Sequence, residues 1–184
     1  IALYAVVSEL QNNIVGSRVM KIYQPKKDEL WIFLYQNGQE FKLLVSVNST
    51  NCRLHLTEEE ISNPASPPMF CMILRKYLIG GRLKQIVQKD LERIVEITIQ
   101  NNNEYMQHVE YRLIIEIMSK HSNIILVHAD DNTIIDAIKR ISSDINRYRE
   151  ILPGKVYIYP PLDDKISLLS FDRNLACDKL LQDY

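Results

Sequence analysis

The sequence has little of what marks several common protein classes. Its cysteines are few, odd in number and widely spaced (Cys52, Cys71 and Cys177), which does not suit a disulfide framework. Reduced thiols of this kind are typical of a reducing cytoplasm, so we expect a cytoplasmic protein. A membrane-spanning helix needs roughly 20 apolar residues, and charged residues interrupt every apolar stretch well before that length. The sequence therefore argues against a disulfide-rich secreted domain and against a membrane protein.

Catalytic and cofactor-binding motifs are missing as well. The sequence contains no Walker phosphate loop, no Gly-x-Gly-x-x-Gly and no Gly-x-Ser-x-Gly. Its histidines (His55, His108, His121 and His128) have no short ligand spacing, and the cysteines form no Cys-x-x-Cys pair. We therefore expect no metal site, no cofactor and no catalytic residue.

An excess of charge of one sign is also absent, because the net charge is −1 and the sequence pI is about 6.5. No global positive field would attract nucleic acid. The local distribution is uneven, since the acidic run 58–60 is followed by a long segment without acids. The basic residues of that segment predict a secondary basic patch, although a helix dipole could also explain the first two. They are Arg75, Lys76, Arg82 and Lys84.

The first third of the sequence predicts one helix and an antiparallel meander. Apolar residues recur at helical spacing over residues 3–15, and Gly16 follows where a left-handed C-cap is favourable. Asn37-Gly38 is the clearest hairpin signal. Short β-rich segments bounded by turn residues predict strands at 18–24, 29–36, 40–47 and 52–56.

A second helix is predicted within residues 66–81. Ser66 is a candidate N-cap, Pro67 and Pro68 suit the first turn, and Gly80-Gly81 ends the segment. Further strands are predicted at 82–88, 93–100, 109–118, 123–129 and 133–141. About nine strands and two principal helices predict an α+β domain, most simply a β-sandwich with flanking helices.

Two features stand out from this pattern. The segment 119–123, Ser-Lys-His-Ser-Asn, places polar groups between two apolar strands, where a plain turn would suffice. Arg93 is in line with the inward positions of its predicted strand, and a buried arginine must find an anion. Glu116 and a phosphate of a ligand are candidate partners, while fraying of the strand at its first residue is the alternative.

Several segments together carry a resemblance to a known family. "EIMSKHSNIILV" (116–127), "NPASPPMFCMILRKYLIGG" (63–81), "LERIVEI" (91–97) and "YREILPGKVYIYPP" (148–161) occur in the family's order. They resemble the NFACT-N domain of bacterial fibronectin-binding protein A (FbpA) homologues, of RqcH and of eukaryotic relatives such as NEMF. The resemblance implies an NFACT-N domain over residues 1–162, followed by a linker and the start of a helical segment at 163–184.

The resemblance also implies a fold and a function. The fold would be similar to the N-terminal domain of formamidopyrimidine-DNA glycosylases, but the catalytic Pro-Glu start of those enzymes is not present, so glycosylase activity is the least favoured reading. The function would be ribosome-associated quality control. Family members bind a stalled large ribosomal subunit and recruit tRNA, chiefly alanine tRNA, for C-terminal tailing.

The family's RNA-contacting elements map onto specific residues of this sequence. Glu92-Arg93 matches an Asp-Arg pair, and Ser119 replaces an expected glycine, which puts in doubt a backbone geometry with positive φ. We expect Arg93 and Lys120 to meet phosphates, and His121 and Asn123 to contact bases or ribose. The implied RNA-binding residues are Glu92, Arg93, Glu116, Ile117, Met118, Lys120, His121, Ser122 and Asn123.

The family's older name implies a rival function, adhesion to fibronectin or fibrinogen at the cell surface. The opening residues do not read as a secretion signal, and "LPGKV" departs from the Leu-Pro-x-Thr-Gly anchor pattern. Surface display would therefore require a non-classical route, and we favour RNA binding.

Overall fold

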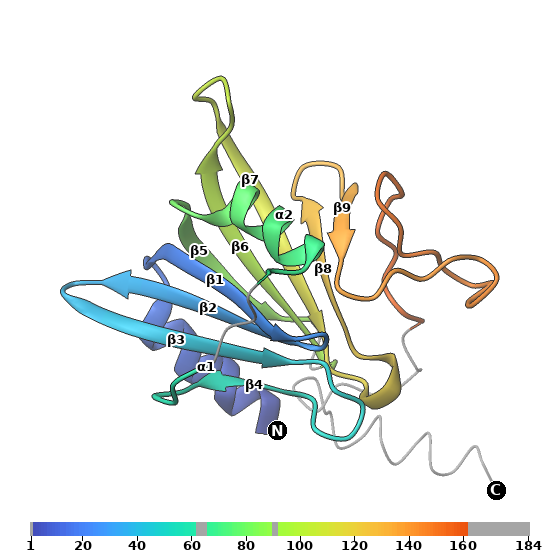
Figure 1. Cartoon of the computed structure of the whole chain (residues 1–184), viewed down its shortest axis with the longest axis horizontal. Helices are drawn as coiled ribbons and strands as arrows, with labels where there is room; N and C mark the ends of the chain where they lie inside the picture. The colour runs from blue at the N-terminus through green and yellow to red at the C-terminus, as the bar shows by residue number, and fades with distance from the viewer. Residues whose placement is uncertain (1, 62–65, 90–91, 162–184) are drawn as a thin grey trace, which may run out of the picture.

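The computed structural model describes residues 2–61, 66–89 and 92–161. These residues form an antiparallel sheet with two α-helices, α1 (Ala2–Ile14) and α2 (Met69–Leu78) (Figure 1). In the described part of the chain, neither helix has the length and apolar character needed to cross a membrane. The mixed α+β class predicted from the sequence is confirmed.

The strands follow the predicted positions closely, except that the strand predicted at 133–141 is confined to Ile134–Ala137. They are β1 (Arg18–Lys26), β2 (Glu29–Gln36), β3 (Gln39–Ser46), β4 (Arg53–Leu56), β5 (Arg82–Gln88), β6 (Ile94–Asn102), β7 (His108–Glu116), β8 (Asn123–His128) and β9 (Ile134–Ala137). Their order in the sheet is β4-β3-β2-β1-β5-β6-β7-β8-β9. The hairpin at Asn37-Gly38 is confirmed, since both residues have positive φ, 51° and 82°, as a tight two-residue turn requires.

The prediction of a sandwich made of two separate sheets is wrong, because the nine described strands form one hydrogen-bonded sheet. Its two halves meet where β1 pairs with β5, and the only residue pair in register there is Arg18 with Arg82. Strand propensity predicts where strands occur but not which strands pair, so it could not reveal this narrow junction. The likeness to glycosylase domains stays a prediction.

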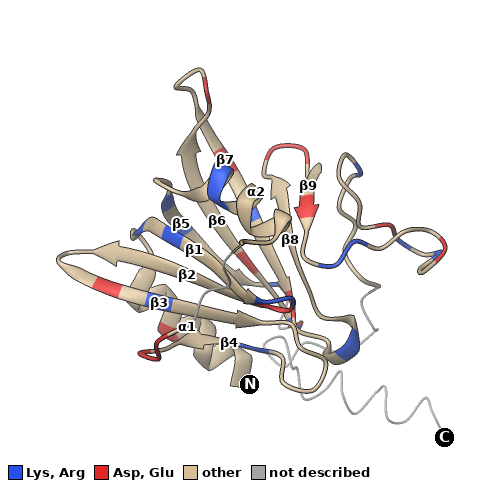
Figure 2. Ribbon diagram, viewed as in Figure 1, with Lys and Arg blue, Asp and Glu red and all other residues tan. Residues whose placement is uncertain are grey.

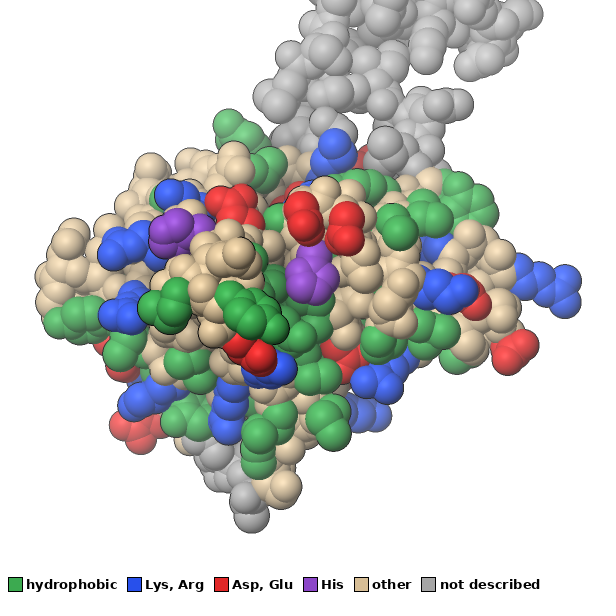
Figure 3. All heavy atoms as spheres, turned by 90° about the horizontal axis from the view of Figure 1, so that it is seen from above, with side chains coloured by type: hydrophobic (Ala, Val, Ile, Leu, Met, Phe, Trp, Pro, Cys, Tyr) green, Lys and Arg blue, Asp and Glu red, His purple; other side chains and the backbone are tan. Residues whose placement is uncertain are grey.

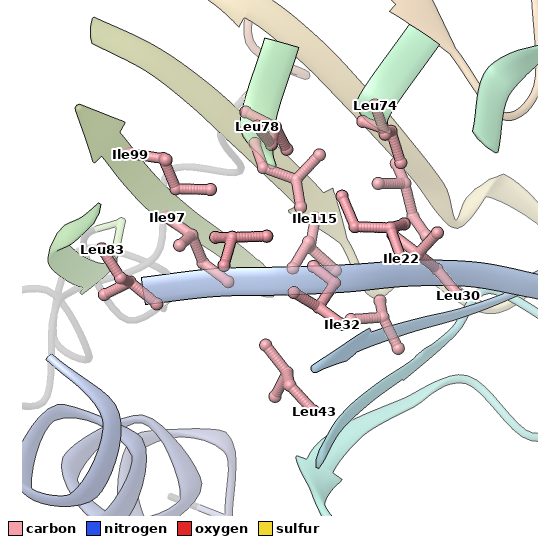
Figure 4. Close-up of a cluster of buried hydrophobic side chains, with 14 of the residues drawn as sticks. Ile22, Leu30, Ile32, Leu43, Leu74, Leu78, Leu83, Ile97, Ile99 and Ile115 are labelled. Atoms are coloured by element: carbon pink, nitrogen blue, oxygen red, sulfur yellow. The ribbon is translucent and has the colours of Figure 1, made fainter. Parts of the chain in front are cut away.

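One hydrophobic core nevertheless joins the two halves of the sheet (Figure 4). Helix α1 contacts β4 and β5, and helix α2 contacts β1, β6 and β9, so each helix bridges the halves. Burial of each large apolar side chain contributes roughly 1.5–3 kcal/mol. The core includes Ile22, Leu30, Ile32 and Leu43 from the first half, Leu83, Ile97, Ile99 and Ile115 from the second, and Leu74 and Leu78 from α2.

Helix α2 begins and ends for reasons that the sequence predicted only in part. Pro68 is its N-cap residue and no side chain caps the helix by a hydrogen bond, so the prediction of a Ser66 cap is wrong. Both Pro67 and Pro68 precede the first helical residue, Met69, so the prediction that they lie in the first turn is also wrong. At the other end Gly80 has a φ of 84°, which confirms the predicted glycine stop.

A second, smaller core covers the outer face of β6–β9. The chain after β9 folds back over this face, with antiparallel bridges from Thr133 to Val156 and from Ile141 to Ile151. Strand β8 is therefore buried on both faces, as its continuous apolar sequence predicted. The members of this core are Ile94, Ile114, Ile125, Val127, Ile134, Ala137, Ile151 and Tyr157. The predicted segment 163–184 and Cys177 lie outside the described residues.

Candidate nucleic-acid interface

The polar turn, residues 119–123, has an exposed half and a buried half. Residues 119–121 form a single 3₁₀ turn between β7 and β8, and their side chains are exposed. Ser119 has a φ of 50°, so this position does adopt the left-handed conformation for which glycine was expected. A serine in this region carries a conformational strain of about 1 kcal/mol. The turn thus presents Lys120 and His121 on a strained, well-defined backbone.

The buried half of the polar turn is a structural anchor. Asn123 is fully buried; its Oδ1 accepts hydrogen bonds from the backbone N–H groups of Ile124 (2.9 Å) and Lys139 (3.1 Å), and its Nδ2 donates to the Lys139 carbonyl (2.8 Å). The Ser122 hydroxyl accepts the backbone N–H of Met118 at 2.8 Å. The side chains of Ser122 and Asn123 therefore hold the turn and are not at the surface.

Lys139 is a second anchor, and the sequence analysis did not single it out. Its Nζ donates to the carbonyls of Ser122 and Val47, both at 2.8 Å, and so ties the turn to the chain just beyond β3. Burial lowers the pKa of this amine, because the ammonium loses hydration. No local signal in the sequence distinguishes Lys139 from the neighbouring Arg140.

Arg93 lies at the same end of the sheet as the polar turn, but not in the predicted orientation. The residue precedes β6 and is exposed, so the prediction of an inward arginine is wrong and the alternative of a frayed strand start is correct. Its carbonyl accepts the backbone N–H of Ile117 at 2.8 Å, which fixes it beside the residues leading into the turn. Because Arg93 lies before the first residue of β6, its side chain need not follow the alternation of inward and outward positions along the strand.

Glu116 has a different partner from the one proposed. Its carboxylate is fully buried and receives two hydrogen bonds from Arg149, at 2.8 and 2.6 Å, so the proposed pairing with Arg93 is wrong. The Tyr157 hydroxyl donates a further bond at 2.7 Å. Burial and the neighbouring carboxylate raise the pKa of Tyr157 above its usual range, and Glu116 also raises the pKa of Arg149 despite its burial.

This cluster of Glu116, Arg149 and Tyr157 joins two of the segments that carried the family resemblance. Sequence reasoning missed Arg149 and Tyr157, because nothing local shows that residues more than 30 positions away cover β7. A neighbouring arrangement repeats the chemistry: Arg112 pairs with Glu96 at 3.1 Å, and Tyr159 donates to the same carboxylate. Burial and the Glu96 carboxylate raise the pKa of Tyr159 to about 12. The covering segment is therefore held to the sheet by one buried charge pair, Arg149 with Glu116, and by hydrogen bonds from Tyr157 and Tyr159 to the two carboxylates.

The other predicted RNA-binding residues have mixed exposure. Ile117 packs against the main core and Met118 against the second core. Glu92 is half-buried, and its backbone N–H donates to the Lys89 carbonyl at 2.6 Å. Of the predicted residues, Arg93, Lys120 and His121 are thus exposed charged or polar side chains at this end of the sheet.

The structure gives the residues of the predicted basic patch different surroundings. Arg75 donates to the Ile22 carbonyl at 2.8 Å and lies over the Tyr23 ring, and Lys76 pairs with Glu104 at 3.3 Å. Arg82 and Lys84 are exposed on β5. On the face seen in Figure 3, acidic and basic side chains are interspersed, in keeping with the small net charge. Within the described ranges, no group of three or more potential ligand side chains is arranged to hold a metal ion.

Comparison with protein families gives one match over nearly the whole chain. The family described as "NFACT N-terminal and middle domains" matches residues 1–183. Among curated proteins, the "Rqc2 homolog RqcH" of Bacillus subtilis is 43% identical over 166 residues, which are 90% of this chain and 29% of that protein. Human "Ribosome quality control complex subunit NEMF" is 31% identical over 144 residues, 78% of this chain and 12% of that protein. The chain thus spans less than a third of these relatives.

Solved structures agree with this match. The N-terminal part of the fibronectin/fibrinogen-binding protein from Streptococcus suis is 40% identical and superposes with a TM-score of 0.92, covering 97% of this chain and 67% of that one. The N-terminal domain of the fibronectin-binding protein PavA from Streptococcus pneumoniae is 39% identical with a TM-score of 0.91, covering 98% of this chain and 67% of that one.

Proposed function

Because the chain belongs to the family of NFACT N-terminal and middle domains, whose curated relatives include ribosome quality-control factors, we propose that it is the tRNA-binding part of such a factor. In this proposal the complete protein binds stalled large ribosomal subunits and recruits tRNA, chiefly alanine tRNA, for C-terminal tailing. The role is binding, requires no catalytic group or cofactor, and is carried out in the cytoplasm.

The observation that carries the proposal is the group of exposed cationic and polar side chains at one end of β6–β8. Arg93 is fixed through its backbone bond to Ile117, and Lys120 and His121 stand on a turn anchored by Asn123 and Lys139. Cations held on rigid supports suit phosphates of a folded RNA, and an exposed imidazole can hydrogen-bond or stack on an unpaired base. Such contacts read RNA shape and do not need a strongly basic protein.

The test is binding of labelled alanine tRNA at several salt concentrations. Loss of one phosphate contact should weaken binding and reduce the slope of log K against log salt by about 1. We expect this change for Arg93→Ala and for Lys120→Ala. Arg147→Ala is the matched control, because Arg147 is also exposed and lies in a different loop. If all three variants lose the same tRNA affinity, the loss follows from the lower net charge alone, and the proposed interface is refuted.

A second candidate function is adhesion, because the solved relatives are named as fibronectin- or fibrinogen-binding proteins. The two functions separate with one double variant, Arg93→Glu with Lys120→Glu. This variant should lose tRNA binding and keep any binding to immobilised fibronectin. Fibronectin binding by the chain without detectable tRNA binding would favour adhesion instead.

A further inference from the structure

A cavity of about 370 Å³ lies where the start of α2 meets the end of β1 and strand β9. Figure 2 shows the start of α2 close to β9, together with the charged residues of β9 and of the chain that follows it. The volume is sufficient for a small molecule or one nucleotide. None of the residues that line this cavity is among those that the family resemblance implied.

Gln24, at the end of β1, lines the cavity with an incomplete set of hydrogen bonds. The residue is only 4% exposed, and its Nε2 donates to the Lys27 carbonyl at 3.4 Å. This contact orients the amide, because only the nitrogen can donate to a carbonyl. Oε1 is thus left as a buried acceptor without a hydrogen-bond partner among the described residues. A buried acceptor without a donor costs free energy, which a ligand N–H or O–H would recover.

The start of α2 supplies donors to the same cavity. The bond from the Met72 N–H to the Pro68 carbonyl, 3.2 Å, is the first that runs back along the helix, so the N–H groups of Met69 and Phe70 have no intrahelical acceptor. Within the described residues, no side chain caps this helix. Met69 and Phe70 both line the cavity. An acceptor oxygen of a ligand would therefore meet backbone donors and the positive end of the helix dipole.

Apolar side chains separate these polar groups. Pro68, Met69 and Phe70 come from the start of α2, and Ala137 and Ile138 come from the end of β9 and the residue after it. Phe70 is 6% exposed and forms part of the main core, whereas Met69 is 69% exposed. A flexible thioether at the surface can close over a flat ring, and sulfur contacts aromatic rings favourably.

The charged residues of the cavity leave one cation in excess. Asp136 is 1% exposed, and its carboxylate accepts two hydrogen bonds from Arg140, at 2.8 and 3.1 Å, and one from the Ala137 N–H at 2.8 Å. The acid is therefore neutralised by its own arginine. Lys27 is exposed and forms no ion pair with any described acid. A free ammonium at the cavity suits a ligand that carries phosphate.

These features together select the ligand. It must present an N–H to Gln24 Oε1 and an acceptor to the start of α2, on a flat body that fits between apolar walls, with a phosphate for Lys27. Every nucleobase carries an N–H donor beside an acceptor on a flat ring, and a nucleotide adds the phosphate. A peptide backbone offers donors and acceptors but neither the ring nor the phosphate. We propose that this cavity binds one nucleobase, with the attached phosphate at Lys27.

The nucleotide has two sources, a free nucleotide or an unpaired residue of an RNA. The cavity adjoins the polar turn, because Lys139, which donates to the Ser122 carbonyl at 2.8 Å, lies between the lining residues Ile138 and Arg140. An RNA whose phosphates contact Lys120 can therefore turn one unpaired base into the cavity. The choice of RNA rests on the proposed function, whereas the base site itself does not.

The first experiment tests the base site without RNA, by NMR titration of the methyl-labelled chain with uridine monophosphate. The sequence has five methionines, of which Met69 lines the cavity and Met106 lies on the distant β6–β7 hairpin as an internal control. We expect a saturable shift of the Met69 methyl resonance and none of Met106. The analogue with a methyl group in place of the uracil N–H should bind about tenfold more weakly, since one hydrogen bond is lost. No shift of Met69, or equal affinity for both nucleotides, would overturn the site.

Gln24→Met tests the acceptor directly. The variant should bind uridine monophosphate about tenfold more weakly and should no longer distinguish it from the methylated analogue. Gln85→Met, at an exposed position on β5, is the matched control and should keep the wild-type preference. Lys27→Gln, at the surface, provides a second test: it should reduce the advantage of uridine monophosphate over uridine. A Gln24→Met protein that still prefers the unmethylated nucleotide would overturn the role of Gln24.

Binding of labelled alanine tRNA then separates the two sources. If an RNA base occupies the cavity, Gln24→Met should weaken tRNA binding by about tenfold, the contribution of one stacked base. Loss of uridine monophosphate binding with unchanged tRNA binding would overturn the RNA source and assign the cavity to a free nucleotide. If tRNA fails to bind the wild type while uridine monophosphate binds, the proposed function fails and the base site stands.

Discussion

The buried ion pair of Glu116 and Arg149 yields a sharp prediction for Arg149→Met. The Glu116 side chain is 0% exposed and the Arg149 side chain 9%, and two hydrogen bonds join them. Without the guanidinium, the carboxylate stays buried with the Tyr157 hydroxyl as its remaining side-chain partner. Removing one partner of a buried pair costs about 3–5 kcal/mol, a large part of the 5–15 kcal/mol by which typical domains are stable.

The assay is urea unfolding followed by the fluorescence of Trp31, the only tryptophan in the sequence and 2% exposed. The control is Lys76→Met, which breaks an ion pair whose side chains are 62% and 80% exposed and should cost no more than about 1 kcal/mol. Tyr157→Phe should cost about 1.5–3 kcal/mol, the contribution of one hydrogen bond to a charged group. Unchanged m-values would confirm that stability, not compactness, has changed.

A double variant completes the prediction. Glu116→Met combined with Arg149→Met leaves no buried charge, so it should be more stable than Arg149→Met alone. Two results would refute the reasoning: a loss for Arg149→Met as small as that for Lys76→Met, or a double variant less stable than the single one. Either would mean that the pair is not desolvated in solution.

Three further predictions concern the polar turn and the turn before β9. Because φ is positive at Ser119, Ser119→Gly should raise the free energy of unfolding by up to about 1 kcal/mol and Ser119→Val should lower it. Urea unfolding measures both changes, and an equal loss of stability in the two variants would contradict this prediction. Asn123→Ala should cost at least about 2 kcal/mol by leaving buried backbone groups unpaired, and an unchanged midpoint would show that water replaces the amide. The hydrogen bond from the Thr133 N–H lowers the pKa of the Asp131 carboxyl below its usual value of 3.8. The ionised carboxylate therefore stabilises the fold fully above pH 3.8, and this contribution is lost as the pH falls through the lowered pKa. Acid titration of stability should show this loss in the wild type and not in Asp131→Asn.

Local patterns in the sequence were sufficient for the elements of the fold. Alternating apolar residues, the Asn37-Gly38 turn and the glycine stop after α2 act through neighbours a few residues away, and the structure confirms them. The polar turn was also visible, because polar groups between two apolar strands interrupt a simple period. The resemblance placed Arg93 and Lys120 among the candidate residues, and both are exposed.

Contacts between distant segments decided the rest. The inward position predicted for Arg93 was wrong because Arg93 lies before β6, where strand periodicity no longer decides the face of a side chain. Glu116 is inside because residues 149 and 157 fold over β7. The pairing of Arg18 with Arg82, which joins the two halves of the sheet, brings together residues that are 64 positions apart, counted from 18 to 82. The sequence by itself determined which segments become strands and helices, since that choice depends on local backbone and side-chain preferences. Only the tertiary structure decided which charges are buried in pairs and which face solvent, because pairing depends on chain segments that no local pattern brings together.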